Sequence, residues 1–227
     1  MTATSNNTNV HSYSFGMESK PLKAVESLLN GLRPFGKPFV LKSSARFKLR
    51  ADRESAEILF IEHGCYSAYY TENDQHIYTL FAPSIIGLTQ GYSLYYNIPV
   101  KSLYYIQAEA HCSGFSVPLD VFAEKCDEQA LWHDVSRVLA QRLIMMLARE
   151  RESVGNDAYT KIRFTLQEIW MYPIEIRCKI KVANFIQRRT RLSRSRIMNI
   201  LAALKQGGYI EIESGFLVSV SNLPAAF

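Results

Sequence analysis

The sequence lacks the features of a membrane-spanning protein, a secreted protein and a disulfide-bonded protein. No apolar run approaches the roughly 18 residues that a membrane helix needs. The N-terminal MTATSNNTNVHSYSF has neither the basic nor the apolar region of a signal peptide. The four cysteines form no C-x-x-C pair, and free thiols in a reducing compartment are expected. These absences predict a soluble cytoplasmic protein.

The common catalytic motifs are also missing. The chain contains no G-x-S-x-G, H-E-x-x-H, P-loop or G-x-G-x-x-G pattern. His63-Gly64-Cys65 and His111-Cys112 could supply soft donors to zinc or haem. Such residues more often serve packing, so we predict no enzyme, no cofactor and no metal site.

Acidic residues are absent from one long stretch of the chain. From Ile176 to Ile210 there are nine Lys or Arg and no Asp or Glu. Residues 160–227 hold eleven basic and four acidic side chains, whereas residues 1–159 hold fifteen and seventeen. The positive charge is therefore concentrated in the C-terminal part, which favours a polyanionic partner for that part alone.

The basic stretch Val182 to Leu204 has the pattern of two short helices joined by a tight turn. Ser193 is placed to cap the second helix, because its side-chain oxygen can accept from the first free N–H groups. Ile197, Ile200, Leu201 and Leu204 recur at helical spacing and predict a buried face. A helix that exposes arginine and amide side chains in its first turns can enter the DNA major groove. The residues expected on that outer side are Arg194, Ser195, Arg196 and Asn199. A solvated basic hairpin is the alternative.

The residues after this helix predict a β-hairpin. Gly207-Gly208 is a typical helix end. Tyr209 to Val220 contains two short strand patterns around Ser214-Gly215, which is the wing of a winged helix-turn-helix. Ser214 at the wing tip is a candidate for a phosphate or minor-groove contact.

The N-terminal half has a different pattern. Pro21 to Leu32 is an amphipathic helix by its spacing, and Arg33 to Lys42, with two prolines and a glycine, is expected to be a connection. From Ala45 to Val117, short β-branched and aromatic runs alternate with turn signals such as Asn73-Asp74. This predicts a compact antiparallel sandwich or barrel, and an α+β protein overall.

A long helix is expected from Glu128 to Glu152. Its apolar stripe nearly repeats every seven residues and runs over Leu131, Val135, Val138, Leu139, Leu143, Met146 and Leu147. A second copy of the chain would bury this stripe, and the alternative is that the helix covers its own domain. The predicted division is a flexible tail (1–20), a β-roll (21–127), a dimerisation helix and hinge (128–155) and a winged helix domain (156–227).

This order of elements resembles the Crp/Fnr superfamily of bacterial transcription regulators, over about residues 21–222. Leu192-Ser-Arg-Ser-Arg-Ile resembles the opening of that family's recognition helix. The resemblance implies a homodimer that binds double-stranded DNA, with Arg194 and Asn199 as base readers and Arg196 as a phosphate contact. RNA polymerase is a further partner that it implies. The residues expected to contact DNA are Arg188, Arg189, Arg191, Ser193, Arg194, Ser195, Arg196, Asn199 and Ser214.

The effector half departs from the family pattern. Cyclic-nucleotide binders of the family carry Gly-Glu and later Arg-Ser, and this chain has Gly87-Leu88 and Lys101-Ser102. Leucine cannot accept the ribose hydrogen bond, and lysine lacks the planar fork that suits phosphate. We therefore expect no gating by cyclic AMP. No cysteine precedes Cys65, which excludes the iron–sulfur branch with its N-terminal cysteine cluster.

Three shorter patterns narrow the resemblance. RTRLSRSRIMNIL, GGYIEI and the terminal NLP are similar to the enterobacterial regulators named for inhibiting hydrogen peroxide resistance, the IprA group. This implies a role in the peroxide stress response. Cys178, between Arg177 and Lys179, and Cys126, beside Lys125, are candidate redox thiols, because nearby cations lower a thiol pKa. The alternative is a ligand- or redox-sensing module whose basic domain binds protein or RNA.

Overall fold

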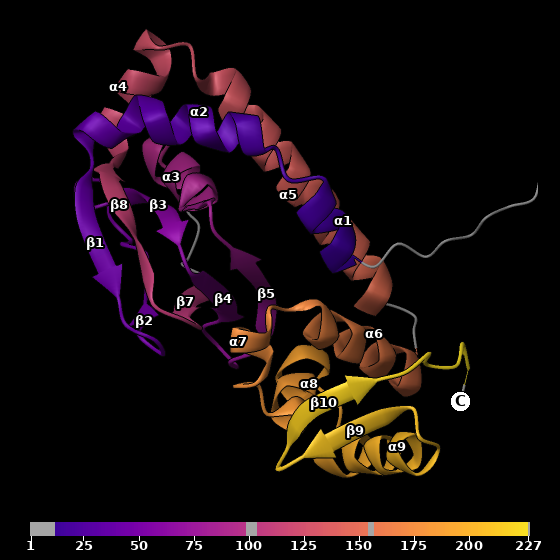
Figure 1. Ribbon diagram of the computed structural model, residues 1–227. Helices are drawn as coiled ribbons and strands as arrows, with labels where there is room; N and C mark the ends of the chain where they lie inside the picture. Colours follow the sequence, from indigo (N-terminus) through magenta and orange to yellow (C-terminus); the bar gives the residue numbers. More distant parts are fainter. Residues whose placement is uncertain (1–11, 99–103, 154–156, 227) are drawn as a thin grey trace, which may run out of the picture.

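The computed structural model describes residues 12–98, 104–153 and 157–226. A β-sandwich with helices on one side is connected by the long helix α5 (Trp132–Ser153) to a smaller domain that ends in a β-hairpin (Figure 1). The α+β prediction is confirmed. Within the described residues, no helix is long and apolar enough to cross a membrane.

The sandwich consists of two antiparallel four-stranded sheets. One sheet has the order β1-β8-β3-β6 and the other β2-β7-β4-β5. In sequence order the strands are β1 (Lys37–Leu41), β2 (Arg46–Phe47), β3 (Glu57–His63), β4 (Cys65–Tyr70), β5 (His76–Phe81), β6 (Ser84–Ile86), β7 (Tyr104–Ala108) and β8 (Cys112–Pro118).

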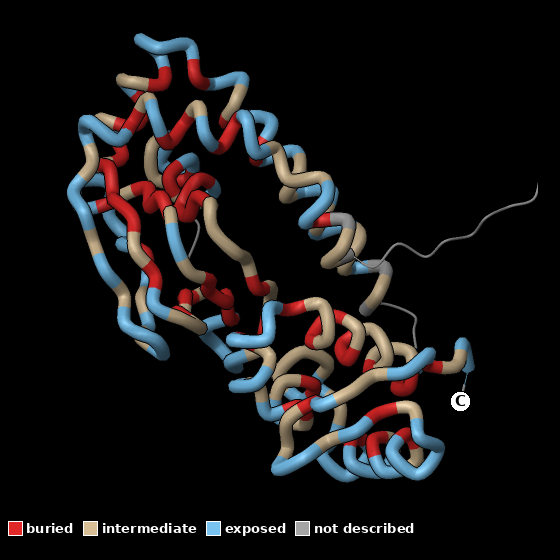
Figure 2. The backbone as a smooth tube through the Cα atoms, viewed as in Figure 1, coloured by how far each residue is buried: buried red, intermediate tan, exposed pale blue. Residues whose placement is uncertain are grey.

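The central strand β3 explains the layering. Ile58 and Phe60 pack in the core shared with the helices, whereas Leu59 and Ile61 pack in the core between the sheets. Successive residues of a strand point to opposite faces, so a strand covered on both sides is apolar throughout. Phe60 stacks on Phe115 of β8, with ring centroids 4.7 Å apart. Buried segments accordingly run through both the strands and the helices above them (Figure 2).

The helices over the first sheet come from both ends of the sandwich sequence. They are α2 (Leu22–Leu32), α3 (Leu88–Tyr95), α4 (Leu119–Glu128) and the first turns of α5. Leu28 and Leu32 of α2 are fully buried there, as the helical spacing predicts.

Three expectations from the sequence were wrong. The segment expected to be a connection, residues 33–42, contains a short 3₁₀ helix (Arg33–Phe35) and strand β1. Pro38 is tolerated in β1 because that strand lies at a sheet edge. Helix α3 interrupts the region expected to contain only strands. The expected tail includes helix α1 (Ser12–Glu18), which lies along α5 (Figure 1).

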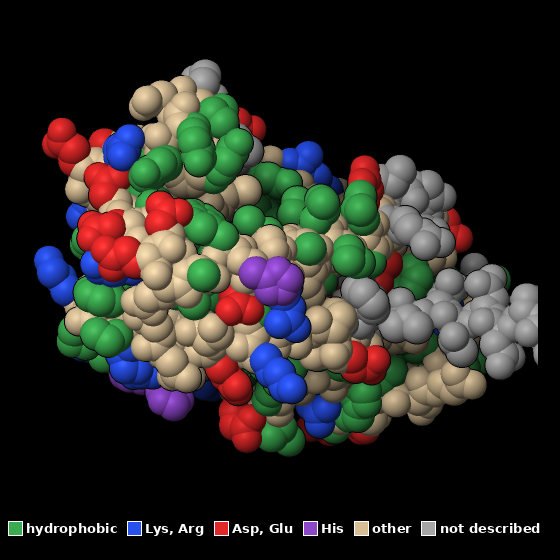
Figure 3. All heavy atoms as spheres, turned by 90° about the horizontal axis from the view of Figure 1, so that it is seen from above, with side chains coloured by type: hydrophobic (Ala, Val, Ile, Leu, Met, Phe, Trp, Pro, Cys, Tyr) green, Lys and Arg blue, Asp and Glu red, His purple; other side chains and the backbone are tan. Residues whose placement is uncertain are grey.

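Helix α5 divides its apolar stripe between two environments. Leu131, just before the helix, and Val135 and Val138 are buried in the chain's own core. Further along, Leu143 and Leu147 are 59% and 53% exposed. Figure 3, which views the molecule from the side of α2, α4 and α5, shows exposed hydrophobic side chains gathered on this face. The first half of the stripe therefore covers its own domain, and the second half has no cover within the described chain.

The C-terminal domain is built from α6 (Ala158–Met171), α7 (Ile174–Arg177), α8 (Val182–Thr190), α9 (Arg194–Gln206), β9 (Ile210–Glu213) and β10 (Phe216–Val220). Ile162 and Leu166 of α6, Ile186 of α8 and Leu204 of α9 are fully buried in one core. This domain thus has a core of its own.

Candidate DNA-binding surface

Helices α8 and α9 form a helix-turn-helix around a three-residue turn. Arg191 ends α8 in the left-handed conformation, with φ of 59°. Thr190 Oγ1 accepts from Leu192 N at 3.3 Å, and Ser193 Oγ accepts from Arg196 N at 3.3 Å. The predicted serine cap of α9 is confirmed. Both hydrogen bonds join a side-chain oxygen to a backbone N–H that has no partner within a helix, and together they stabilise the turn.

Helix α9 has one buried and one open side. Ile197, Leu201 and Leu204 are buried against α6 and α8, and Ile200 is partly buried. The residues predicted to face DNA from this helix, Arg194, Ser195, Arg196 and Asn199, are all exposed. Because the burial follows one stripe, these polar side chains share the face that points away from the domain core.

The open face is cationic and carries little internal pairing. Arg194 donates to Asn184 Oδ1 of α8 at 3.0 Å, which orients its guanidinium across the two helices. No ion pair within the described part of the chain engages Arg191, Arg194 or Arg196. Their positive charge is therefore available to an external anion.

The wing lies beside the start of α8. Lys181 Nζ donates to the Ser214 carbonyl at 2.6 Å and lies 3.7 Å from the centroid of the Phe216 ring. The Val182 N–H donates to the Gly215 carbonyl at 2.9 Å. Ser214 is exposed at the wing tip with φ of 49°. Lys181 was not among the residues predicted from the sequence, because its contacts with the wing join segments that lie more than thirty residues apart in the chain.

Arg188 of α8 is turned toward the β-sandwich. Its guanidinium lies 4.0 Å from the centroid of the Tyr69 ring. It also donates to the Tyr105 hydroxyl at 3.2 Å and to the Asp74 carbonyl at 3.3 Å. These partners belong to β4, β7 and the β4–β5 turn. In this arrangement Arg188 connects the two domains.

Arg189 enters a buried ionic cluster between the domains. Its Nη1 donates to the Ile77 carbonyl at 3.1 Å, and its Nε lies 3.5 Å from Glu168 Oε2. Arg149 of α5 pairs with the same carboxylate at 2.9 Å and also reaches the Ile77 carbonyl, at 2.6 Å. The structure thus gives no support to DNA contacts by Arg188 and Arg189, because both are engaged within the protein.

The cluster controls the charge of Glu168. Burial alone would raise the pKa of this carboxyl, but Arg149 and Arg189 hold it well below its usual range. The Tyr172 hydroxyl donates to Glu168 Oε1 at 2.6 Å and favours the same charged form. One carboxylate therefore joins α5, α6 and α8 through charged groups that are shielded from water.

His76 packs against this cluster from strand β5. Its ring lies 4.8 Å from that of Phe185 of α8, and its Nε2 is 2.9 Å from Thr79 Oγ1. Burial, then the charge of Arg189, lower the pKa of His76 well below its ordinary value. The His76 imidazole is therefore neutral and places no further positive charge beside Arg149 and Arg189.

Comparisons with known proteins agree with this geometry. A family model described as winged helix-turn-helix DNA binding matches residues 158–225. The chain is 31% identical to the Escherichia coli K12 protein named inhibitor of hydrogen peroxide resistance, over 92% of this chain and 98% of the relative. The chain belongs to this family. The narrower resemblance found in the sequence is thereby confirmed.

Solved structures place this member of the peroxide-resistance inhibitor family in the Crp/Fnr fold. The c-di-GMP responsive regulator CLP of Xanthomonas campestris superposes with a TM-score of 0.66 at 12% identity, covering 87% of this chain and 100% of that one. A Crp/Fnr family regulator from Eubacterium rectale gives 0.64 at 16% identity, covering 90% and 95%. At these identities the likeness establishes the fold, as the resemblance predicted.

The structure also locates the first residues that correspond to the family's nucleotide clamp. Gly87, with φ of 98°, begins α3, and Leu88 follows it with a buried side chain. The chain therefore has an apolar side chain at the position where cyclic-nucleotide binders of the family carry the carboxylate for the ribose hydroxyl. Lys101 lies outside the described residues.

The two candidate redox cysteines differ. Cys126 is fully buried, and burial raises its pKa to about 12, the opposite of what a reactive thiolate needs. The structure therefore opposes the prediction for Cys126, because the core removes the effect expected from neighbouring Lys125. Cys178 is exposed at the end of α7.

Proposed function

We propose that this protein is a homodimeric, sequence-specific DNA-binding transcription regulator of the cytoplasm. The observation that carries the proposal is helix α9, which buries Ile197, Leu201 and Leu204 while it exposes arginines that form no salt bridge within the described residues. In this assignment Arg194 and Asn199 read base edges, because arginine and asparagine offer the donor patterns that purines accept. Arg196 binds phosphate, and Arg191, Ser193, Ser195 and Ser214 line the same contact.

The proposed partner of α5 is a second copy of the chain. Leu143, Met146 and Leu147 are each more than half exposed, and Ile144 nearly so. Apolar side chains along a helix lose this exposure when an identical helix packs against them. Light scattering should show a dimer for the wild type and a monomer for Leu143→Glu/Leu147→Glu. A dimer that survives both charges would contradict this interface.

The four-part division predicted from the sequence stands as part of this proposal, with α1 moved to the side of α5. A peroxide stress role rests on the name of the E. coli relative. RNA polymerase is a partner by resemblance alone. Exposed Cys178 is the thiol that we propose as the peroxide-sensitive one.

Selection from a random DNA duplex library tests the main assignment. The wild type should enrich a two-fold symmetric sequence, and an RNA competitor should displace it less than the enriched duplex does. Arg194→Ala should lose about 1–3 kcal/mol of preference for the enriched sequence over random DNA. Equal weakening on both duplexes would contradict base reading by Arg194, and no enrichment by the wild type would contradict the regulator itself.

A further inference from the structure

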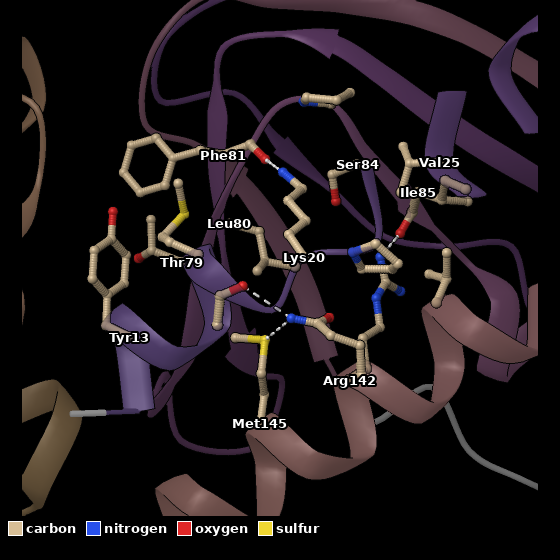
Figure 4. Close-up of a pocket in the computed structure, with 16 residues that line it drawn as sticks. Tyr13, Lys20, Val25, Thr79, Leu80, Phe81, Ser84, Ile85, Arg142 and Met145 are labelled. Atoms are coloured by element: carbon tan, nitrogen blue, oxygen red, sulfur yellow. Dashed lines mark hydrogen bonds between the residues drawn. The ribbon is translucent and has the colours of Figure 1, made fainter. Parts of the chain in front are cut away.

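A small cavity lies at the open edge of the β-sandwich. It has a volume of about 40 Å³ and is lined by the edge strands β5 and β6, by α5 and by the N-terminal segment that contains α1 (Figure 4). A single water-sized site needs roughly 10–15 Å³ by the same measure. The cavity can therefore hold a few atoms and has no room for a nucleotide.

Two cationic side chains enter this cavity from different elements. Lys20 reaches in from the α1–α2 connection and donates to the Phe81 carbonyl at 2.7 Å. Arg142 reaches in from α5 and donates to the Ile85 carbonyl (Figure 4). An ammonium has three donors and a guanidinium five, so these two contacts leave most of the donors unused.

No carboxylate within the described residues forms an ion pair with Lys20 or Arg142. At the contact between the domains, by contrast, the two cations Arg149 and Arg189 share the carboxylate of Glu168. Burial, then repulsion from Arg142, lower the pKa of Lys20 to about 8. Two like charges in a shielded cavity raise the free energy of the folded state unless an anion lies between them.

A pair of hydroxyl groups adjoins the cavity. Ser84 lines the cavity, and its Oγ lies 2.9 Å from the hydroxyl of buried Tyr66. Burial raises the pKa of Tyr66, and the charge of Arg142 opposes that effect. A serine hydroxyl beside an ammonium and a guanidinium is a donor set that suits an oxyanion.

We propose that the cavity binds a small oxyanion, held between Lys20 and Arg142 with Ser84 as a further donor. The volume restricts the occupant to an inorganic oxyanion or a compact carboxylate. The bound anion would join the N-terminal segment to α5, the helix that carries the exposed apolar face. This site shares no residue with the DNA-binding surface, so it does not depend on the proposed DNA function.

Methionine methyl groups provide a local test. Met17 and Met145 line the cavity, whereas Met198 is exposed on α9. The full-length protein, labelled with ¹³C at the methionine methyls, is titrated with inorganic phosphate or with acetate against sodium chloride of equal ionic strength. We expect saturable shifts of Met17 and Met145 with at least one of the two anions, and no matching shift with chloride.

Two pairs of variants make the test specific. Lys20→Gln and Arg142→Gln should each weaken the response at least tenfold. Lys23→Gln and Arg137→Gln, exposed neighbours on α2 and α5, should leave it unchanged. Lys20 lies in a connection, so Lys20→Gln decides the matter even if Arg142→Gln does not fold.

Three results would overturn the proposal. Met17 and Met145 show no saturable shift with either anion, or their shift persists in Lys20→Gln, or only Met198 shifts. The last result would place the anion on the arginines of α9. The first would mean that the two cations serve only to cap the carbonyls of the sandwich edge.

Discussion

Two groups of arginines lie within ten residues of each other on the helix-turn-helix and have opposite environments. Arg188 and Arg189 of α8 are partly buried and bind groups of the sandwich and of α6. Arg194 and Arg196 of α9 are exposed and form no salt bridge within the described residues. The sequence shows one continuous basic stretch, but the structure divides it into charges that join domains and charges that face outward. Net charge therefore indicates a polyanion partner without indicating which side chains meet it.

The largest expected effect follows from removing Glu168, the carboxylate that Arg149 and Arg189 share. Glu168→Ala removes the carboxylate that pairs with the largely buried Arg149 and Arg189, and it should lower the free energy of unfolding by about 3–5 kcal/mol. Urea denaturation measures this loss. Glu175→Ala, an exposed glutamate in the following helix, should stay within about 0.5 kcal/mol of the wild type. Similar free energies of unfolding for the two variants would show that the ion pairs of Glu168 do not stabilise the contact between the domains.

The same carboxylate predicts an acid sensitivity. An unfolded glutamate titrates near pH 4.3, and the pKa of Glu168 is lower in the folded protein. Its stabilising contribution is therefore complete above about pH 4.3 and is lost as the pH falls from there through the folded pKa. The free energy of unfolding should fall more steeply with acid in the wild type than in Glu168→Gln. Parallel pH curves would contradict a charged Glu168.

Arg188→Ala tests the contact between α8 and the β-sandwich. The lost cation–π contact and hydrogen bonds should lower the free energy of unfolding by about 1–2 kcal/mol. Amide hydrogen exchange should become faster in the β4–β5 hairpin, where the guanidinium binds. Gln187→Ala, exposed on the same helix, provides the control. Unchanged exchange in the hairpin would mean that Arg188 does not hold α8 against the sandwich.

The smallest expected effect concerns Arg191, between the two groups. Its left-handed conformation costs a residue with a side chain roughly 1–2 kcal/mol. Glycine avoids this cost but loses more backbone entropy on folding, which costs roughly 0.5–1 kcal/mol. Arg191→Gly should therefore change the free energy of unfolding by no more than about 1 kcal/mol. If Arg191 also contacts phosphate, the variant should bind all DNA more weakly. Unchanged DNA affinity would restrict Arg191 to the turn.

The sequence predicted the C-terminal domain better than the rest, because its signals are local. The Ser193 cap, the stripe over Ile197, Leu201 and Leu204, and the hairpin around Ser214-Gly215 each depend on a few neighbouring residues. Helix α3 was missed since its tyrosines match strand composition, and its position depends on packing against α4 and β3. Strand β1 was missed because prolines in edge strands resemble those in connections.

The division of the arginines was not predictable from the sequence. Arg188 and Arg189 differ from Arg194 only in the partners that the fold brings to them, and Asp74, Ile77 and Tyr105 are about 80 to 110 residues away. Likewise, the two cations of the edge cavity, Lys20 and Arg142, are more than 100 residues apart in the chain. Contacts at such separations leave no periodic pattern in the chain.

The salt dependence of DNA affinity tests the division of the two groups most directly. Affinity for a random duplex is measured at several salt concentrations for the wild type, Arg196→Ala and Arg188→Ala. Because each phosphate contact releases about one counterion, Arg196→Ala should reduce the slope of log affinity against log salt by about one, and Arg188→Ala should leave the slope unchanged. A slope reduced by Arg188→Ala and unchanged by Arg196→Ala would contradict the account.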